Sequence, residues 1–97
     1  MKALQFNVIQ QEYTEQTEVE VTNLCNGFTA RNIGDDTVRV NGIALLPRLV
    51  PGTSGESVEI TGNEGEIYRG RIQLTFAGVG VAPRVEIIQK FYLNNQL

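Results

Sequence analysis

Apolar and polar residues alternate along most of this chain, and that period of two constrains the fold more than any other feature of the sequence. In "TEVEVTNL", Val19 and Val21 alternate with Glu18 and Glu20. The same alternation occurs in "ALQFNVIQ", "GFTARNI", "TVRV", "SVEI", "IYRGRIQLTF" and "PRVEIIQKFYL". Because successive side chains of a β-strand point to opposite faces, each run predicts a strand with one buried face.

Turn signals separate these runs. They are Asn26-Gly27, Gly34-Asp35, Asn41-Gly42, Pro51-Gly52, Gly62-Asn63 and Gly78-Val79-Gly80. Nothing in the chain has the apolar period of a long helix, so about seven short strands, mostly antiparallel, are expected. The sequence therefore predicts an all-β fold, either an immunoglobulin-like β-sandwich or a small barrel, in a single domain over residues 1–97.

The N-terminal part of the chain has a weaker pattern. Residues 1–16 are expected to form an N-terminal arm or an edge strand. Residues 9–18, "IQQEYTEQTE", are polar on every side and lack an apolar stripe. This composition predicts a loop or an exposed turn over residues 9–18.

Residues 40–60 combine glycine, proline and apolar residues in a way that resembles a binding loop. Asn41-Gly42 instead predicts a two-residue hairpin turn, because both central positions of that turn need positive φ. Pro47 and Pro51 each remove a backbone donor, which places this segment at a sheet edge or between two sheets. Pro51-Gly52 is typical of a type II turn. We interpret the segment as structural, with an exposed contact loop as its only expected function.

The charge pattern limits the partners. The net charge is −3, and basic residues are scattered singly along the chain. Proteins that bind nucleic acid cluster Lys and Arg to neutralise phosphates, so no nucleic-acid partner is expected. No apolar run reaches the roughly 20 residues of a membrane span, so no membrane partner is expected. With a single cysteine and no export signal, synthesis in a reducing cytoplasm is expected.

The residue types needed for common chemistry are missing. The chain has no histidine, which removes the usual general base and most zinc sites. "GTSGE" has Glu56 where a nucleophile elbow needs glycine, and "GVG" at 78–80 is not followed by a helix start. Cys25 has no basic neighbour in sequence and is expected to be a buried apolar residue. We therefore expect no enzymatic activity and no cofactor.

Several polar and aromatic residues remain as candidate partner contacts. Asp35 and Asp36 have the composition of calcium ligands, but aspartates in such turns more often cap their own backbone. The acids between Glu12 and Glu20 are expected to form a solvated strand face or a negative patch that meets a basic partner. Arg69 and Arg71 flank Gly70 in a predicted strand, where they would lie on one face. The candidate contacts are Arg48, Leu49, Arg69, Arg71, Tyr13 and Tyr68, with core or rim packing as the alternative for the tyrosines.

The run "FTARNIGDDTVRVNGIALLP…PGTSGESVEITGNEGEIYRGRIQLTFAG…VEIIQKFYL" resembles small immunoglobulin-like β-sandwich proteins among the virion components of tailed phages, particularly those infecting Bacteroidota. The resemblance covers about residues 27–93. It implies a non-enzymatic structural protein of the virion, such as a capsid decoration, auxiliary or fibre-attachment protein. Its expected partner is a major capsid protein or another virion protein with a repeating surface, and a homo-oligomer is compatible with that role.

A second reading of the same pattern remains open. An immunoglobulin-like sandwich can also serve a bacterial cell as a module that binds glycans or proteins. Copy number separates the two readings, because a decoration protein co-purifies with particles in many copies.

Overall fold

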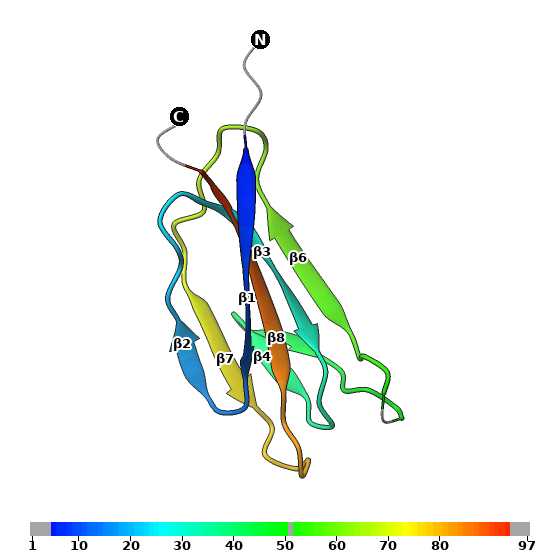
Figure 1. The fold of residues 1–97 in the computed structure, drawn as a ribbon. Coiled ribbons are helices and arrows are strands. Elements are labelled where there is room, and N and C mark those ends of the chain that lie inside the picture. The colour runs from blue at the N-terminus through cyan, green and yellow to red at the C-terminus, as the bar shows by residue number, and fades with distance from the viewer. Residues whose placement is uncertain (1–4, 51, 94–97) are drawn as a thin grey trace.

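The computed structural model describes residues 5–50 and 52–93 of the chain. These residues form eight strands and no helix (Figure 1). The strands are β1 (Phe6–Tyr13), β2 (Thr17–Val19), β3 (Cys25–Asn32), β4 (Val38–Val40), β5 (Ile43–Leu45), β6 (Ser57–Thr61), β7 (Ile72–Phe76) and β8 (Val85–Tyr92). The predicted all-β fold is confirmed.

Two four-stranded antiparallel sheets make up the fold, which is consistent with the predicted β-sandwich and not with a closed barrel. One sheet has the order β1-β8-β3-β6, and the other has the order β2-β7-β4-β5. Strand pairs are nested along the chain, since β1 pairs with β8, β2 with β7, β3 with β6 and β4 with β5. A long hairpin rolled up in this way is the arrangement of an eight-stranded jelly roll.

This strand order, which the sequence did not predict, differs from that of immunoglobulin domains. In an immunoglobulin sandwich the first two strands lie in the same sheet. Here β1 and β2 lie in different sheets. The two orders share their antiparallel strands and turn chemistry, so the local pattern of the sequence does not separate them.

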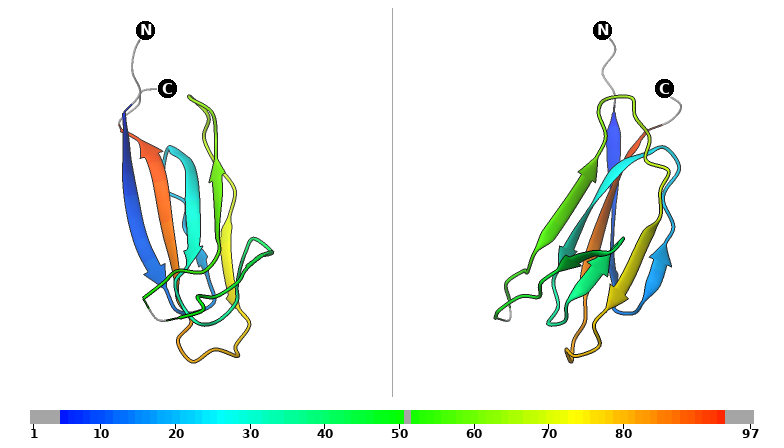
Figure 2. Two further views of the ribbon diagram at one scale, coloured as in Figure 1. Left: turned by 90° about the vertical axis from the view of Figure 1, so that its right-hand side faces the viewer. Right: turned by 180° about the vertical axis from the view of Figure 1, so that it is seen from behind.

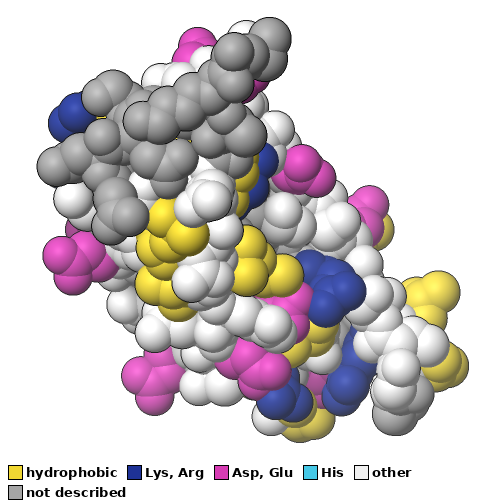
Figure 3. All heavy atoms as spheres, turned by 45° about the horizontal axis from the view of Figure 1, so that its top comes forward, with side chains coloured by type: hydrophobic (Ala, Val, Ile, Leu, Met, Phe, Trp, Pro, Cys, Tyr) yellow, Lys and Arg dark blue, Asp and Glu magenta, His cyan; other side chains and the backbone are white. Residues whose placement is uncertain are grey.

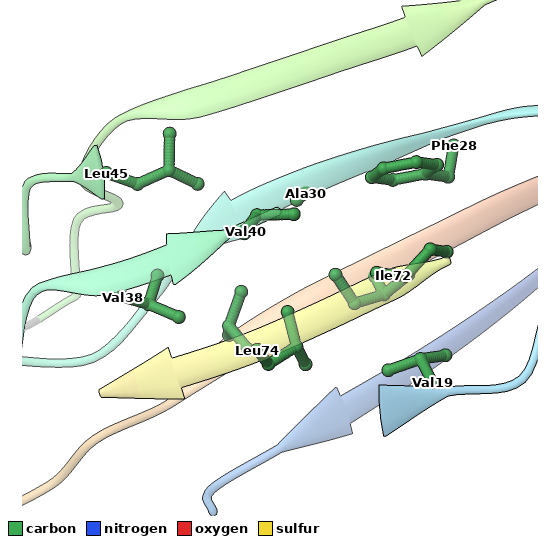
Figure 4. Close-up of a cluster of buried hydrophobic side chains, with 10 residues drawn as sticks. Val19, Phe28, Ala30, Val38, Val40, Leu45, Ile72 and Leu74 are labelled. Carbon is green, nitrogen blue, oxygen red and sulfur yellow. The ribbon is translucent and has the colours of Figure 1, made fainter. Parts of the chain in front are cut away.

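The core lies between the two sheets. Figure 4 shows side chains from both sheets pointing toward one another, with Phe28 and Ala30 on one side and Val38, Ile72 and Leu74 on the other. All of these side chains are buried. They occupy the positions that the alternation predicts, so the apolar faces of β3, β4 and β7 are confirmed.

The predicted loop over residues 9–18 is wrong. β1 continues through Tyr13, and Thr17 and Glu18 already belong to β2. β1 pairs with β8 along its full length, from Phe6↔Tyr92 to Tyr13↔Val85. An edge strand takes its order from this backbone ladder, and it needs no continuous apolar face.

The turn predicted at Asn26-Gly27 is also wrong. Both residues lie inside β3, where the pairing with β8 shifts by one residue in a β-bulge. A Cβ on Gly27 would lie 2.2 Å from the backbone oxygen of Ile60 in β6. Glycine is present here because the neighbouring backbone passes too close for a side chain.

The hairpin turn predicted at Asn41-Gly42 and the edge position predicted for the segment after it agree with the structure. Asn41 and Gly42 have φ values of 51° and 85°, and Val40 pairs with Ile43 across the turn. β5 is an edge strand, and the chain then crosses from one sheet to the other before β6. The predicted Pro51-Gly52 turn lies partly outside the described residues, although Gly52 has a φ of 86°.

The sandwich has two distinct ends. The molecule measures 49 × 24 × 17 Å. Both described chain ends lie at one end of the long axis, as the two further views in Figure 2 show. The β1–β2, β3–β4, β5–β6 and β7–β8 connections lie at the other end.

Candidate functional site: an apolar loop tip

Three loops meet at the end of the sandwich that lies away from the chain ends. They are residues 33–37 between β3 and β4, residues 46–56 between β5 and β6, and residues 77–84 between β7 and β8. We call these loops the loop tip, leaving out residue 51. The 33–37 loop joins the other two: Arg48 N–H donates to the Gly34 carbonyl at 3.1 Å, and Asp35 N–H donates to the Ala82 carbonyl at 3.2 Å.

A buried asparagine holds the base of the loop tip. The amide nitrogen of Asn32 donates to the carbonyls of Asp36 and Leu45, at 2.7 and 2.9 Å. Its side-chain oxygen accepts from Gly34 N–H at 3.0 Å. Asn32 is fully buried, so each of these bonds replaces one to water that folding removes. The side chain therefore fixes the 33–37 loop to the end of β5.

Two aspartates tie the third loop to this base. Asp36 accepts from Gly78 N–H at 2.7 Å, and Asp35 accepts from Val81 and Ala82 N–H at 3.2 and 2.7 Å. The sequence predicted that these aspartates cap their own turn, but they cap a loop more than forty residues further along the chain. Within the described residues, no group of three or more His, Cys, Asp or Glu could hold a metal ion.

This frame presents several large apolar side chains to water. Leu49, Val79 and Val81 have 96%, 86% and 94% of their surface exposed to water. Leu46 and Val50 are also exposed on the same loops. Figure 3 shows hydrophobic side chains on the projecting loop at the lower right of the molecule. Exposed apolar side chains that gather on one part of a surface mark a contact site, so the loop tip is the candidate surface for binding another molecule.

Two of the predicted contact residues lie in the loop tip. Leu49 is its most exposed apolar side chain, and Arg48 precedes it with a half-buried side chain. Sequence reasoning missed Leu46, Val50, Val79 and Val81 as contacts. The signal for the two valines is the run "AGVGVAP", in which glycine and proline leave no strand for the valines to be buried in.

Tyr68, Arg69 and Arg71 lie in another part of the molecule. The segment 67–71 precedes β7, so the predicted strand placement of Arg69 and Arg71 is wrong. Tyr68 packs edge-on against Phe28 with ring centroids 5.4 Å apart, and its hydroxyl donates to the Arg71 carbonyl at 2.7 Å. A Cβ on Gly70 would lie 2.4 Å from the Tyr68 hydroxyl, which explains the glycine. The packing alternative for Tyr68 is the one observed.

A shallow hollow of about 270 Å³ opens beside Tyr68. Residues 21–24 and 67–70 line it. Close to its rim, Arg71 forms an ion pair with Glu18 at 3.4 Å, and both side chains are well exposed. Exposed pairs of this kind contribute about 0–1 kcal/mol to stability. The structure therefore separates Arg69 and Arg71 from Arg48 and Leu49 and does not form one site from the predicted contacts.

Tyr13 and Cys25 have structural surroundings. Tyr13 ends β1, packs against the core cluster, and burial raises the pKa of its hydroxyl. Cys25 is fully buried, as predicted, and its thiol lies 3.3 Å from the Gly27 carbonyl. Burial raises the pKa of this thiol above its usual value, which keeps it protonated and unreactive.

Comparisons of the chain with protein-family models, with curated proteins and with solved structures gave no match. Over residues 5–50 and 52–93, no helix is long and apolar enough to cross a membrane.

Proposed function

We propose that this chain is a non-enzymatic structural protein of a tailed-phage virion, a capsid decoration, auxiliary or fibre-attachment protein that binds a repeating protein surface through its loop tip. One observation carries the docking part of this proposal. Five exposed apolar side chains, those of Leu46, Leu49, Val50, Val79 and Val81, sit on loops tied together by buried Asn32 and by Asp35 and Asp36.

The energetics suit such a role. Burying a Leu or Val side chain is worth about 1.5–3 kcal/mol, and loops that are already ordered lose little entropy when they bind. A few anchors of this kind give modest affinity at one site. On a particle that repeats the same site, the occupied fraction then depends on the free concentration of the chain relative to Kd.

The virion part of the proposal rests on the resemblance of residues 27–93. The jelly-roll order adds an analogy, because viral capsid domains and lectins both use this architecture. An analogy of fold does not by itself identify function. The location therefore needs its own test.

Counting copies in particles tests the location directly. Particles produced by the genome that encodes this chain are purified by density gradient, and the chain is quantified by mass spectrometry against the major capsid protein. We expect tens to hundreds of copies per particle, at a fixed ratio to a capsid or tail protein. A particle fraction free of the chain, with binding to a glycan array instead, would favour the bacterial binding module.

A further inference from the structure

The outer edge of β1 is the longest unpaired strand edge in the described sheets. β1 has eight residues, whereas the other three edge strands, β6, β2 and β5, have five, three and three. An unpaired edge presents a row of backbone donors and acceptors that can pair with another strand.

The hydrogen-bond pattern identifies the outward groups. Leu93 N–H donates to the Gln5 carbonyl at 3.0 Å, next to the pair Phe6↔Tyr92. Antiparallel pairs alternate between bonded and non-bonded, so the backbone groups of Phe6, Val8, Gln10 and Glu12 face away from β8. Val8 N–H agrees, because its acceptor is the neighbouring Asn7 side chain at 2.9 Å.

Within the part of the chain that the structure describes, the outer edge of β1 lacks the usual protections of an edge strand. The strand "FNVIQQEY" contains no proline, glycine or lysine, the usual protections of an edge. Its single charge, on Glu12, is paired with Arg84 of the same chain. Phe6, Val8 and Ile9 are 38%, 55% and 37% exposed. Figure 3 shows hydrophobic side chains gathered around β1, in the middle of the face.

We propose that a second copy of this chain pairs with β1 in antiparallel fashion, with Ile9 of each copy opposite Ile9 of the other. This register places Phe6 opposite Glu12, Asn7 opposite Gln11 and Val8 opposite Gln10. All four outward residues then exchange hydrogen bonds, about eight in total, whereas a shift by two residues keeps about six. Ile9 meets its mate at a non-bonded pair, where side chains come closest.

The charges favour this register. Glu12 of one copy lies about six residues, or roughly 20 Å, along the strand from Glu12 of the other, so the two carboxylates do not repel at short range. Glu12 instead faces Phe6 of the second copy. The Lys90 ammonium lies 4.7 Å from the centre of the Phe6 ring within each chain, so the charge nearest the residue opposite Glu12 is a cation and not a second carboxylate.

This pairing is independent of the loop tip. It joins two four-stranded sheets edge to edge and leaves the tips of both copies uncovered. Replacing Leu49 and Val81 by Ser should therefore leave the dimer unchanged, whatever happens to particle binding. A failure of the proposed function and a failure of this inference are distinguishable.

Light scattering during size-exclusion chromatography of the full chain, loaded at two concentrations up to about 1 mM, measures the mass. We expect twice the 10.7 kDa of one chain at the higher concentration. Val8→Pro removes an outward N–H and leaves the pairing with β8 intact, so this variant should be monomeric with unchanged circular dichroism. A wild-type monomer at the higher concentration, or a dimer lost in Leu49→Ser/Val81→Ser, would overturn the proposal.

Disulfide cross-linking tests the register in a second set of variants. Ile9→Cys places two thiols at a non-bonded antiparallel pair, within the Cβ separation that a disulfide accepts. Under mild oxidation we expect Ile9→Cys to form a covalent dimer and Gln11→Cys, whose mate is Asn7, to stay largely uncross-linked. Equal cross-linking of the two variants, or none in either, contradicts the register. Because Cys25 is buried, the wild type serves as the background control.

Discussion

At the residue scale, buried amide side chains join segments of the chain by hydrogen bonds, which the apolar core cannot provide. Asn32 holds the loop tip. Gln89 accepts from Thr22 N–H at 2.8 Å and donates to the Glu20 carbonyl at 3.0 Å, which ties β8 to the segment after β2. Asn26 donates to the Tyr92 hydroxyl and to two carbonyls of the 63–66 turn. Asn32 lies at the end of β3 and Asn26 at its bulge, whereas Gln89 lies within β8, where its backbone is paired on both sides.

The first prediction concerns Asn32. Asn32→Ala removes three hydrogen bonds and leaves two buried carbonyls without their donor, so the free energy of unfolding should fall by roughly 2–3 kcal/mol. Asn63→Ala, at an exposed turn position, is the matched control and should change it by less than about 0.5 kcal/mol. Urea titration followed by circular dichroism measures both. Similar losses in the two variants would contradict the role assigned to Asn32.

The second prediction concerns the Cys25 thiol. Its pKa is raised above 9.0 by burial, so the folded state favours the protonated form. The resulting stabilisation is complete below pH 9, the usual thiol pKa, and is lost as pH rises through the raised value. Cys25→Ala should therefore lose less stability between pH 8 and pH 10 than the wild type does. Equal alkaline losses would contradict the assignment.

The same burial predicts slow alkylation. A domain with about 5 kcal/mol of stability exposes a buried thiol only rarely, so iodoacetamide should label native Cys25 about 4,000-fold more slowly than the unfolded chain. Mass spectrometry of timed samples at pH 8 gives both rates. A native rate near the unfolded one would show that Cys25 is accessible.

At the element scale, alternation predicted most strands because one side of each faces the core. Val38 and Val40 in β4, and Ile72 and Leu74 in β7, were assigned to buried faces from spacing alone. For β1, alternation predicted a strand only as far as residue 10, and the face it assigned to burial, with Phe6 and Val8, is exposed, because β1 takes its order from a ladder with β8. The bulge in β3 was not predicted, because Asn-Gly in a sequence usually indicates a turn. The conformation of Asn26-Gly27 is set instead by the backbone of β6, which passes close to Gly27.

The third prediction contrasts two glycines. Gly27→Ala places a Cβ against the Ile60 carbonyl of β6, so β3 and β6 must separate. Gly42 has a φ of 85° but open space around it, so Gly42→Ala carries only backbone strain of about 1–2 kcal/mol. Gly27→Ala should lower the melting temperature by clearly more than Gly42→Ala does. The reverse order would contradict the close approach of β6.

At the scale of the whole molecule, the alternation and turn signals of the sequence did not predict which strands pair with one another. Any of these strands could pair with any other by local criteria. The observed nesting, in which Phe6 pairs with Tyr92, joins opposite ends of the chain. Of the loop tip, the sequence singled out Leu49 and Arg48, because proline kept their segment out of a sheet. It did not single out Val79 and Val81, because only the folded molecule brings their loop beside the first one.

The proposed function requires that the loop tip docks on a virion surface. Co-sedimentation of the chain with purified particles from a genome lacking its gene tests this most directly, with Leu49→Ser/Val81→Ser compared against wild type and against Glu59→Ser on β6. We predict saturable binding of wild type and Glu59→Ser, and at least about tenfold weaker binding of the tip variant, the equivalent of about 1.4 kcal/mol. Equal binding of all three proteins, or no binding of the wild type, would contradict the account.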